Sequence, residues 1–436
     1  MRMTEEHTAH EASRASMVIA TLSTVVEWYD FTLYLYFATV LSRVFFGGGE
    51  HSLLATLAGF AISYGMRPLG AMVFGHIGDR IGRRRTLLLS MMLMTFAMLA
   101  TAMLPGYAAI GPAAGGLLML LRCFMAFSVG GEYTGVVAYL LEGARAERRG
   151  LVTSLASAAS EVGALLAVAL SALTVGLMDT ADLDAWGWRM PFLAGAALAG
   201  GVWIARSAME ESPDFLRQVE QRSVPGSPLR DTLAHHRPAL FRTFAISALG
   251  SITYYVGITY VPTFLSSSGT LAEGRSLGLS TLAAVAVILV TPWAGALSDR
   301  VGRKPVLVWL AVAGMLLPLA MFGLMAGGTQ VTIALAAIVL ACLAGGVSAV
   351  GAPATAEQFP GEGRLSGLAL GVTVATAIFG GLTPFLAELL IQLTGWKSVP
   401  GAMIAVVALA VLPVLLTMPE THPRAAAQGR RTYSEP

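Results

Sequence analysis

Long apolar stretches alternate with short polar ones over most of the 436-residue chain. Between Met17 and Met418, apolar runs of 18 or more residues recur, and a helical run of that length is long enough to cross the hydrocarbon core of a bilayer. The pattern predicts twelve transmembrane helices, at 17–42, 52–76, 86–104, 112–140, 150–178, 189–209, 239–266, 276–298, 305–326, 331–355, 364–393 and 397–418.

The longest polar break separates the sixth predicted helix from the seventh. This stretch, 210–238, is rich in Glu, Arg, Pro and Ser and reads as a linker between two six-helix bundles, 17–209 and 239–418. Short polar tails, 1–16 and 419–436, flank them. The expected fold class is therefore an all-α polytopic membrane protein built from two pseudo-symmetric bundles.

Composition supports a membrane protein and argues against an enzyme. Hydrophobic residues make up 55% of the chain and charged residues 12%, whereas a soluble domain carries about 25% charged residues. Walker A, HExxH and clustered Cys/His patterns are missing from the sequence, and no polar segment is long enough for a catalytic or signalling domain. We expect no metal and no cofactor, and the net charge of +2 does not indicate nucleic-acid binding.

Arginine and lysine concentrate in alternate loops, which fixes the expected orientation because cytoplasmic loops are enriched in these residues. The opposite loops carry almost none. We therefore expect the basic loops, the linker and both tails to lie in the cytoplasm, and the protein to span the inner (plasma) membrane. The basic residues are Arg80 and Arg83–Arg85, then Arg145, Arg148 and Arg149, then Arg217, Arg222, Arg230 and Arg237, then Arg300, Arg303 and Lys304.

One polar motif occurs twice, at half the length of the chain. Residues 75–85 read GHIGDRIGRRR after the second helix, and residues 295–304 read GALSDRVGRK after the eighth. A second repeated feature follows the fourth and tenth helices, where a Glu precedes an Arg by seven residues: Glu142 and Arg149, Glu357 and Arg364. Both features indicate that the two halves are parallel repeats of one unit.

The doubled Gly-x-x-x-Asp-Arg-x-Gly-Arg-Arg/Lys motif resembles the signature of the major facilitator superfamily. Further segments resemble its metabolite:H⁺ symporter branch, whose members carry proline/betaine, α-ketoglutarate, citrate or shikimate. The resemblance runs from about Val18 to Leu416 and implies symport of a small molecule with H⁺ by alternating access, in a protein that works as a monomer. The segments are EWYDF at 27–31, RPLG at 67–70, GGEYTG at 130–135, WGWRMPF at 186–192 and AEQFP at 356–360.

The resemblance also implies that the repeated motif is a latch that closes the cytoplasmic side. Asp79 can accept hydrogen bonds from backbone amides and Arg groups, and Gly75 allows close helix approach. The compatible alternative is that the arginines only set the topology. The predicted latch residues are Gly75, Asp79, Arg80, Arg83, Asp299, Arg300, Arg303, Glu142, Arg149, Glu357 and Arg364.

Four ionisable residues fall near the middle of predicted membrane helices, where charge is costly unless it faces the protein interior. Glu27 and Asp30 share one face of the first helix, Arg122 lies in the fourth helix and Glu161 in the fifth. We predict Asp30 as the first proton carrier, Glu27 as the second and Glu161 as the third. The alternative is an ion pair with Arg122 that only holds the helices together. Two further charges, Arg67 and Glu132, are expected nearer the cytoplasmic ends of their helices.

The predicted substrate contacts divide between the two halves. Arg122 has the planar fork that suits a carboxylate, and Tyr34 follows Asp30 on the same helix face. Mid-helix charge is missing from the seventh to tenth predicted helices, so we expect the second half to supply aromatic and hydroxyl groups, among them Tyr254, Tyr255 and Thr376.

Arg122 favours a small organic acid, such as a di- or tricarboxylate, as the substrate. The alternative is a zwitterionic osmolyte of the proline/betaine kind, because tyrosines of the seventh helix can surround an ammonium group. A proton-driven exporter is less favoured: the exporter-like GPAAGG stands at 111–116, at the start of the fourth helix instead of in the fifth. Uniport without proton coupling is a further alternative.

Overall fold

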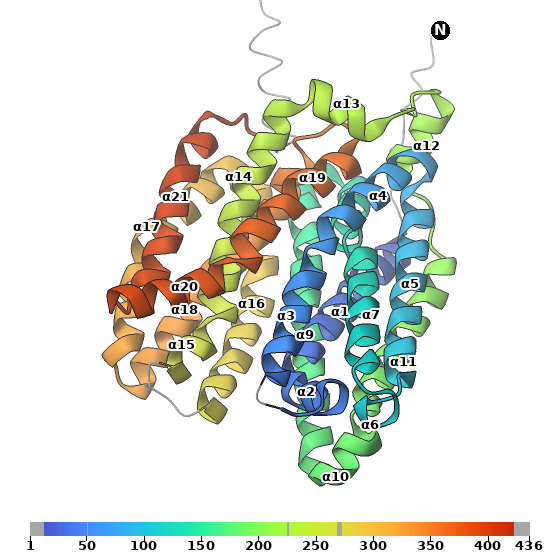
Figure 1. Ribbon diagram of the computed structural model, residues 1–436. Coiled ribbons are helices and arrows are strands. Elements are labelled where there is room, and N and C mark those ends of the chain that lie inside the picture. Colours follow the sequence, from blue (N-terminus) through green and yellow to red (C-terminus); the bar gives the residue numbers. More distant parts are fainter. Residues whose placement is uncertain (1–12, 50, 225, 268–272, 423–436) are drawn as a thin grey trace, which may run out of the picture.

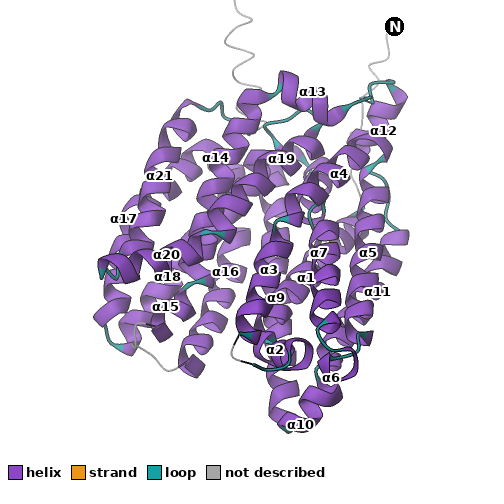
Figure 2. Ribbon diagram, in the orientation of Figure 1, coloured by secondary structure: helices purple, strands orange, loops and turns teal. Residues whose placement is uncertain are grey.

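The computed structural model describes residues 13–49, 51–224, 226–267 and 273–422, and every regular element in these ranges is a helix (Figures 1 and 2). Each of the twelve predicted spans coincides with one helix or with consecutive helices that continue one another. The largest difference at an end is in the second span, which runs to Ile81 instead of 76, and short turns divide some spans in their interior.

The first six spans form one bundle, drawn from blue to green in Figure 1. Three of these spans consist of two helices each, namely α1 with α2, α3 with α4 and α7 with α8. The bounds are α1 Arg14–Tyr36, α2 Ala38–Phe46, α3 Ser52–Tyr64, α4 Met66–Ile81, α5 Arg83–Met103, α6 Tyr107–Ile110, α7 Ala113–Val129, α8 Glu132–Gly143, η1 Ala146–Arg148, α9 Arg149–Leu177, α10 Thr180–Asp182, η2 Leu183–Gly187 and α11 Arg189–Ser207.

The last six spans form the second bundle, joined to the first by a linker that contains two short helices. Two of these spans include one turn of π-helix, η3 and η4, where the helix is locally wider than an α-helix. The linker helices are α12 Pro213–Glu220 and α13 Pro228–His235; the second bundle contains α14 Arg237–Tyr254, η3 Tyr255–Thr259, α15 Val261–Ser267, α16 Glu273–Val301, α17 Arg303–Gly327, α18 Gln330–Ala356, α19 Arg364–Thr376, η4 Ala377–Gly381, α20 Thr383–Thr394 and α21 Val399–Thr417.

Among the described residues, eight of the twelve spans are long and apolar enough to cross a membrane by length and composition alone. The other four predicted spans are helical as well; α1 contains Glu27 and Asp30, and α4 contains Arg67. The eight are Arg83–Met103, Ala113–Gly143, Ala146–Leu177, Thr281–Val301, Arg303–Gly327, Gln330–Ala356, Arg364–Thr394 and Val399–Thr417.

The bundles stand side by side with their helices roughly parallel, so the molecule has two opposite ends. Helices α12 and α13 lie at one end, which we call the linker face, and α2, α6 and α10 lie at the other, which we call the distal face (Figure 1). Helix α14 begins next to α13, and α9 begins at the loop after α8. Helices α14 and α9 therefore both run from the linker face toward the distal face.

The two bundles meet through matching helix pairs, α9 against α16 and α4 against α19. Glycines lie where the backbones come closest. A Cβ atom on Gly150 would lie 2.4 Å from the carbonyl oxygen of Gly295, and one on Gly75 would lie 3.0 Å from the Cβ of Ala369. The interface therefore depends on small residues that let helix backbones approach, as is common between membrane helices.

Close packing also holds α1 against α9 within the first bundle, and this contact tests the architecture. A Cβ on Gly163 of α9 would lie only 2.2 Å from the carbonyl oxygen of Val25, whereas a Cβ on Gly176 of the same helix would meet nothing within 4 Å. We expect Gly163→Ala to lower the melting temperature of the purified protein by several degrees, because overpacking costs about 1–3 kcal/mol.

The control is Gly176→Ala, which adds the same methyl group to the same helix in open space. Its melting temperature should equal the wild-type value or exceed it slightly, since alanine is the better helix former by about 1 kcal/mol. Equal melting temperatures for the two variants would contradict this packing.

Candidate functional site

A central cavity of about 180 Å³ lies between the two bundles. The wall from the first bundle carries its three charged residues, Glu27, Arg67 and Glu161, while the described wall from the second bundle carries hydroxyl, aromatic and apolar residues. This matches the predicted division between a charged half and a hydroxyl-rich half. The cavity is smaller than a pocket for a drug-sized ligand, so its occupant is small.

Arg67 is the cation of the central cavity, and the sequence analysis did not select it. Its guanidinium lies 3.6 Å from Glu27, and it stacks over the rings of Tyr64 and Phe31 at 4.7 and 5.2 Å. Arg67 thus contacts Glu27, which its expected position nearer the end of its span did not anticipate. The span runs from Ser52 to Ile81, farther than the expected end at 76, so Arg67 lies close to its middle.

Glu161 connects the two halves across the cavity. The hydroxyl of Tyr254 donates a hydrogen bond of 2.5 Å to Glu161, and the Tyr254 ring packs edge-on against Trp28 with centroids 5.3 Å apart. Beside this contact the hydroxyls of Tyr64 and Tyr255, one from each half, share a hydrogen bond. Since α14 runs toward the distal face and Tyr254 is its last residue, these tyrosines lie at the distal end of the cavity lining.

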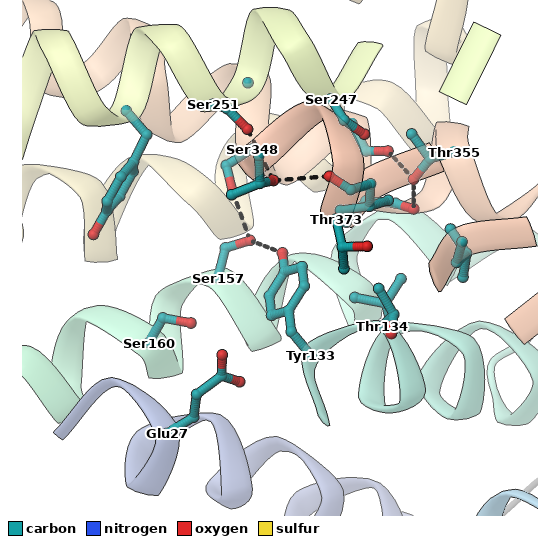
Figure 3. Close-up of a pocket in the computed structure, with 18 of the residues that line it drawn as sticks. Glu27, Tyr133, Thr134, Ser157, Ser160, Ser247, Ser251, Ser348, Thr355 and Thr373 are labelled. Carbon is teal, nitrogen blue, oxygen red and sulfur yellow. Dashed lines mark hydrogen bonds between the residues drawn. The ribbon is translucent and has the colours of Figure 1, made fainter. Parts of the chain in front are cut away.

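Hydroxyl groups line much of the cavity (Figure 3). Ser157 bonds both Tyr133, at 3.1 Å, and Ser348 of the second bundle, at 3.0 Å. On the second bundle, Ser251 and Thr376 bond each other at 3.0 Å. A hydroxyl can donate or accept, so this wall can satisfy either kind of polar group on a small solute.

Asp30 and Arg122 form a second buried pair away from the central cavity. Arg122 donates to Asp30 at 2.8 Å, and its guanidinium lies over the rings of Tyr34 and Phe192 at 5.3 and 5.9 Å. Arg122, Asp30 and Tyr34 do not line the central cavity but a smaller one of about 30 Å³. We call this smaller space the side cavity.

The predicted site residues therefore fall into two groups. The central cavity is lined by two of the predicted proton carriers, Glu27 and Glu161. It is also lined by three of the predicted substrate contacts, Tyr254, Tyr255 and Thr376. Asp30, Arg122 and Tyr34 lie behind it. Spacing along a helix predicted that Arg122 and Asp30 lie at a similar depth, and the two are in contact. Spacing did not indicate which neighbour the Arg122 side chain would bind.

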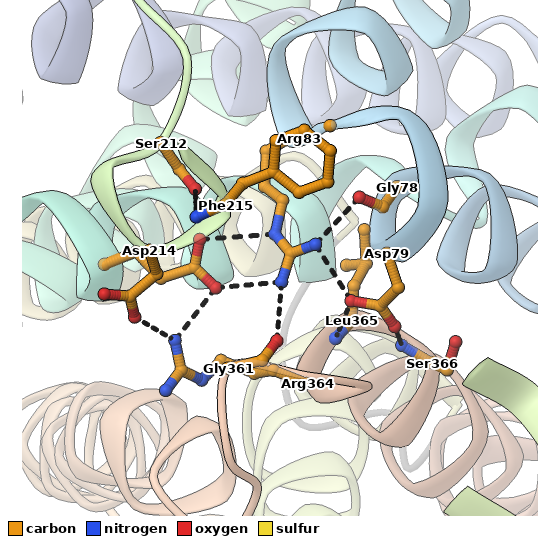
Figure 4. A network of polar contacts seen from close by, with 12 residues as sticks. Gly78, Asp79, Arg83, Ser212, Asp214, Phe215, Gly361, Arg364, Leu365 and Ser366 are labelled. Atoms are coloured by element: carbon orange, nitrogen blue, oxygen red, sulfur yellow. Dashed lines mark hydrogen bonds and ion pairs between the residues drawn. The ribbon is translucent and has the colours of Figure 1, made fainter. Parts of the chain in front are cut away.

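The repeated motif closes the linker face in the first of two matching contacts (Figure 4). Asp79 accepts hydrogen bonds from the backbone amides of Ser366, at 2.8 Å, and Leu365, at 3.3 Å, and it pairs with Arg83 at 2.9 Å. These amides stand at the start of α19 in the other bundle. A helix N-terminus stabilises a carboxylate through its free amides and its dipole.

The second contact repeats the first with the roles of the bundles exchanged. Asp299 accepts from the backbone amides of Gly150 and Leu151, both at 2.8 Å, at the start of α9. It also pairs with Arg303 at 2.8 Å. Each bundle thus supplies one aspartate and one helix N-terminus to the closure.

Glutamates and arginines extend both contacts. Glu142 pairs with Arg83 at 3.0 Å and with Arg364 of the other bundle at 2.8 Å, and Arg364 also reaches Asp214 of the linker at 2.9 Å. In the second bundle, Glu357 pairs with Arg303 at 3.3 Å. The linker is therefore part of the closure, which the sequence analysis did not anticipate.

Three predicted latch residues do not join this network. Arg80 and Arg300 are exposed, and Arg149 is half-buried; none of them forms an ion pair with a residue that the structure describes. Gly75 lies at the bundle interface, as described above.

Two parallel, pseudo-symmetric six-helix halves around a central cavity, held together on one face by hydrogen bonds between them, are the architecture of a membrane transporter. Comparisons with known proteins agree. Residues 16–228 match the family model described as sugar (and other) transporter, and residues 268–433 match that of the major facilitator superfamily.

Curated relatives cover nearly the whole chain. A glycine betaine/proline/ectoine/pipecolic acid transporter of Dickeya dadantii is 32% identical over 94% of this chain and 83% of its own length. An α-ketoglutarate permease of Escherichia coli is 33% identical over 85% and 86%. A citrate-proton symporter of Klebsiella pneumoniae is 30% identical over 90% and 89%.

The fold is also that of solved transporters. A proton:xylose symporter superposes with a TM-score of 0.77 at 18% identity, over 93% of this chain and 96% of that one. The chain belongs to the major facilitator superfamily, as a multi-pass membrane protein of the metabolite:H⁺ symporter branch.

The closure makes a prediction for Asp79→Asn. The amide keeps an acceptor oxygen but loses the charge that binds Arg83 and two backbone amides. Hydrogen bonds to charged groups contribute about 1.5–3 kcal/mol each, so we expect the linker face to open at least about tenfold more often and transport to slow. A cysteine at the cavity residue Thr355, with Cys123 and Cys342 replaced by alanine, should react correspondingly faster with a maleimide applied from the linker face.

Glu147→Gln is the matched control, because Glu147 is an exposed acid on the same face. Its labelling and transport rates should equal those of the parent. Unchanged labelling and normal uptake in Asp79→Asn, at normal membrane abundance, would argue that the motif only sets topology.

Proposed function

We propose that this protein couples inward movement of H⁺ to the uptake of a small zwitterion with one carboxylate, of the proline/betaine kind, by alternating access. In this proposal the protein works as a monomer in the inner membrane, with the linker face and both ends of the chain in the cytoplasm. It moves its substrate unchanged, without catalysis. The observation that carries the proposal is the charge pattern of the central cavity: one guanidinium, two carboxylates and a group of aromatic rings.

The charges favour a zwitterion over a polyanion. With both acids ionised, Glu27 and Glu161 contribute −2 and Arg67 contributes +1, which leaves −1 in the cavity lining. A di- or tricarboxylate would bring further negative charge to this lining. A zwitterion offers its carboxylate to the planar fork of Arg67 and its cationic head to Glu161 and the rings of Trp28 and Tyr254, where cation–π attraction operates.

The substrate preference from sequence rested on Arg122. Because Arg122 is bonded to Asp30 and lies outside the central cavity, it no longer supports a di- or tricarboxylate. An organic acid remains the second candidate for one reason. If Glu27 and Glu161 are both protonated, the charge of the lining changes from −1 to +1, which would suit an anion.

Proton coupling follows from the loose pair of Glu27 and Arg67. A proton on Glu27 removes the negative partner of Arg67, so the guanidinium becomes free to bind a substrate carboxylate. Loss of that proton restores Glu27 as a competitor for Arg67 and expels the substrate. Glu161 contributes in the same way through Tyr254, because its protonation state alters a hydrogen bond that connects the two bundles.

Uptake is favoured over export by the fifth span. In α9, Glu161 stands in the cavity wall, and the exporter-like GPAAGG segment lies at the distal start of α7. Accumulation of label inside intact cells supports uptake, and extrusion would contradict it. Uptake insensitive to a protonophore would indicate uniport.

Purified protein in liposomes tests the substrate. With an inward proton gradient, we expect accumulation of labelled glycine betaine or proline, but not of citrate or α-ketoglutarate. Arg67→Lys should reduce it at least about tenfold, because an ammonium cannot replace the bidentate fork. The control is Arg43→Lys, whose arginine pairs with Asp184 at 2.7 Å outside both cavities.

Two results would contradict the assignment. Accumulation of citrate or α-ketoglutarate without betaine and proline would favour the organic acid. Normal transport by Arg67→Lys would mean that the carboxylate binds elsewhere.

Glu161→Gln tests proton coupling. We expect the variant to exchange external for internal substrate at near the wild-type rate, but to lose at least about 90% of gradient-driven accumulation, because glutamine cannot take up a proton in the cycle. Glu388→Gln is the matched control, since Glu388 accepts from Tyr260 at 2.5 Å in a similar carboxylate–tyrosine pair away from the cavity. Protonophore-sensitive accumulation by Glu161→Gln would remove Glu161 from the coupling scheme.

A further inference from the structure

The side cavity connects two of the buried ion pairs of the first bundle. Glu27 and Arg67 lie in the wall between the central and side cavities and line both, whereas Asp30 and Arg122 line only the side cavity. The side cavity is thus a polar space that begins at Arg67, in the wall of the central cavity, and ends at Asp30, which does not line the central cavity.

Both acids present an unused oxygen atom in this region. Glu27 and Asp30 are each only 3% exposed, and their atoms Glu27 Oε2 and Asp30 Oδ1 are buried with no hydrogen bond to any residue that the structure describes. A buried carboxylate oxygen without a donor costs free energy. In native proteins such atoms are commonly satisfied by an ordered water.

The size and charge of the side cavity fit water better than an ion. Its volume of about 30 Å³ exceeds the minimum of roughly 10–15 Å³ that one water needs. The two carboxylates and two guanidiniums in its lining sum to zero charge. The carboxylates repel an anion and the guanidiniums repel a cation, so neither kind of ion is favoured. A water can donate to both acids at once, and the hydroxyls of Tyr34 and Ser63 also line the space.

We propose that the side cavity holds a water that hydrogen-bonds Glu27 and Asp30 and passes a proton between them. Protonated Glu27 gives its proton to the water oxygen while the water gives one of its own protons to the Asp30 carboxylate. Glu27 becomes a carboxylate, Asp30 becomes a carboxylic acid, and the water is regenerated. This inference rests on the proposed function, which supplies a proton to Glu27.

The relay explains how a proton behind the cavity controls the substrate. When the proton is on Glu27, Arg67 is free for the substrate and Asp30 holds Arg122. After transfer to Asp30, Glu27 pairs with Arg67 again and displaces the substrate, while Arg122 loses its partner. Each state leaves one arginine without an acid, so substrate release is tied to proton transfer.

Ala126→Val tests the relay by filling the side cavity without changing a charge. Ala126 lines the side cavity but not the central one. We expect at least a tenfold loss of gradient-driven accumulation in liposomes, with substrate exchange within twofold of wild type. Ala113→Val adds the same two methyl groups at an exposed position of the same helix, α7, and should keep both activities.

Normal accumulation by Ala126→Val would overturn the relay, as would equal loss of exchange and accumulation in a variant with a normal melting temperature. A second measurement needs no substrate. An experimental structure that resolves ordered waters should show one within hydrogen-bonding distance of Glu27 Oε2 and Asp30 Oδ1, and a dry side cavity would overturn the relay.

These outcomes separate the relay from the proposed function. If the wild type exchanges neither betaine nor proline, the proposed substrate is wrong, and the ordered-water measurement still decides the relay. If the wild type transports as proposed and the side cavity is dry, only the relay fails.

Discussion

A charge buried inside a membrane protein must have a partner, and the organisation of this molecule follows from that requirement. The first bundle contains Glu27 with Arg67, Asp30 with Arg122, and Glu132 with Arg206. Removing one member of a buried pair costs about 3–5 kcal/mol. A carboxylate escapes this cost by taking up a proton, and an arginine escapes it by taking a new anion. Proton and substrate can therefore exchange places in the same pairs.

The pairs differ in how firmly they are held, and this difference assigns their roles. Glu132 is bonded to both Arg206 and Ser90 and lies outside both cavities, so it stabilises the bundle. Glu27 approaches Arg67 only to 3.6 Å and faces the cavity. A loose pair beside an open space is the one that a substrate carboxylate can enter at low cost.

The contacts at the linker face occur in matching form in both halves of the chain, whereas the residues that line the central cavity differ between the halves. Asp79 and Asp299 each bind the first amides of a helix in the opposite bundle, and Glu211 and Glu420 each bind the first amides of the helix after the motif. Each bundle thus contributes equally to the closure. Among the described residues that line the central cavity, the charged ones come from the first bundle and the second bundle supplies a neutral wall.

The sequence by itself determined the twelve helices, the two bundles and the paired closure. Hydropathy depends on residues that are neighbours in the chain, and the two copies of the motif can be recognised by comparing short segments. The sequence also limited the candidate proton carriers to a few acids, which the structure shows to be buried. Only the tertiary structure decided which cation faces the cavity. Arg67 and Arg122 both lie in the interior of their spans, and the choice between them depends on how α4 and α7 are rotated about their axes and on which acid of α1 each one meets. Those rotations are set by packing between helices that are distant in the chain, such as the contact of Gly70 in α4 with the backbone of Phe127 in α7. The spacing of residues within one helix therefore cannot predict them.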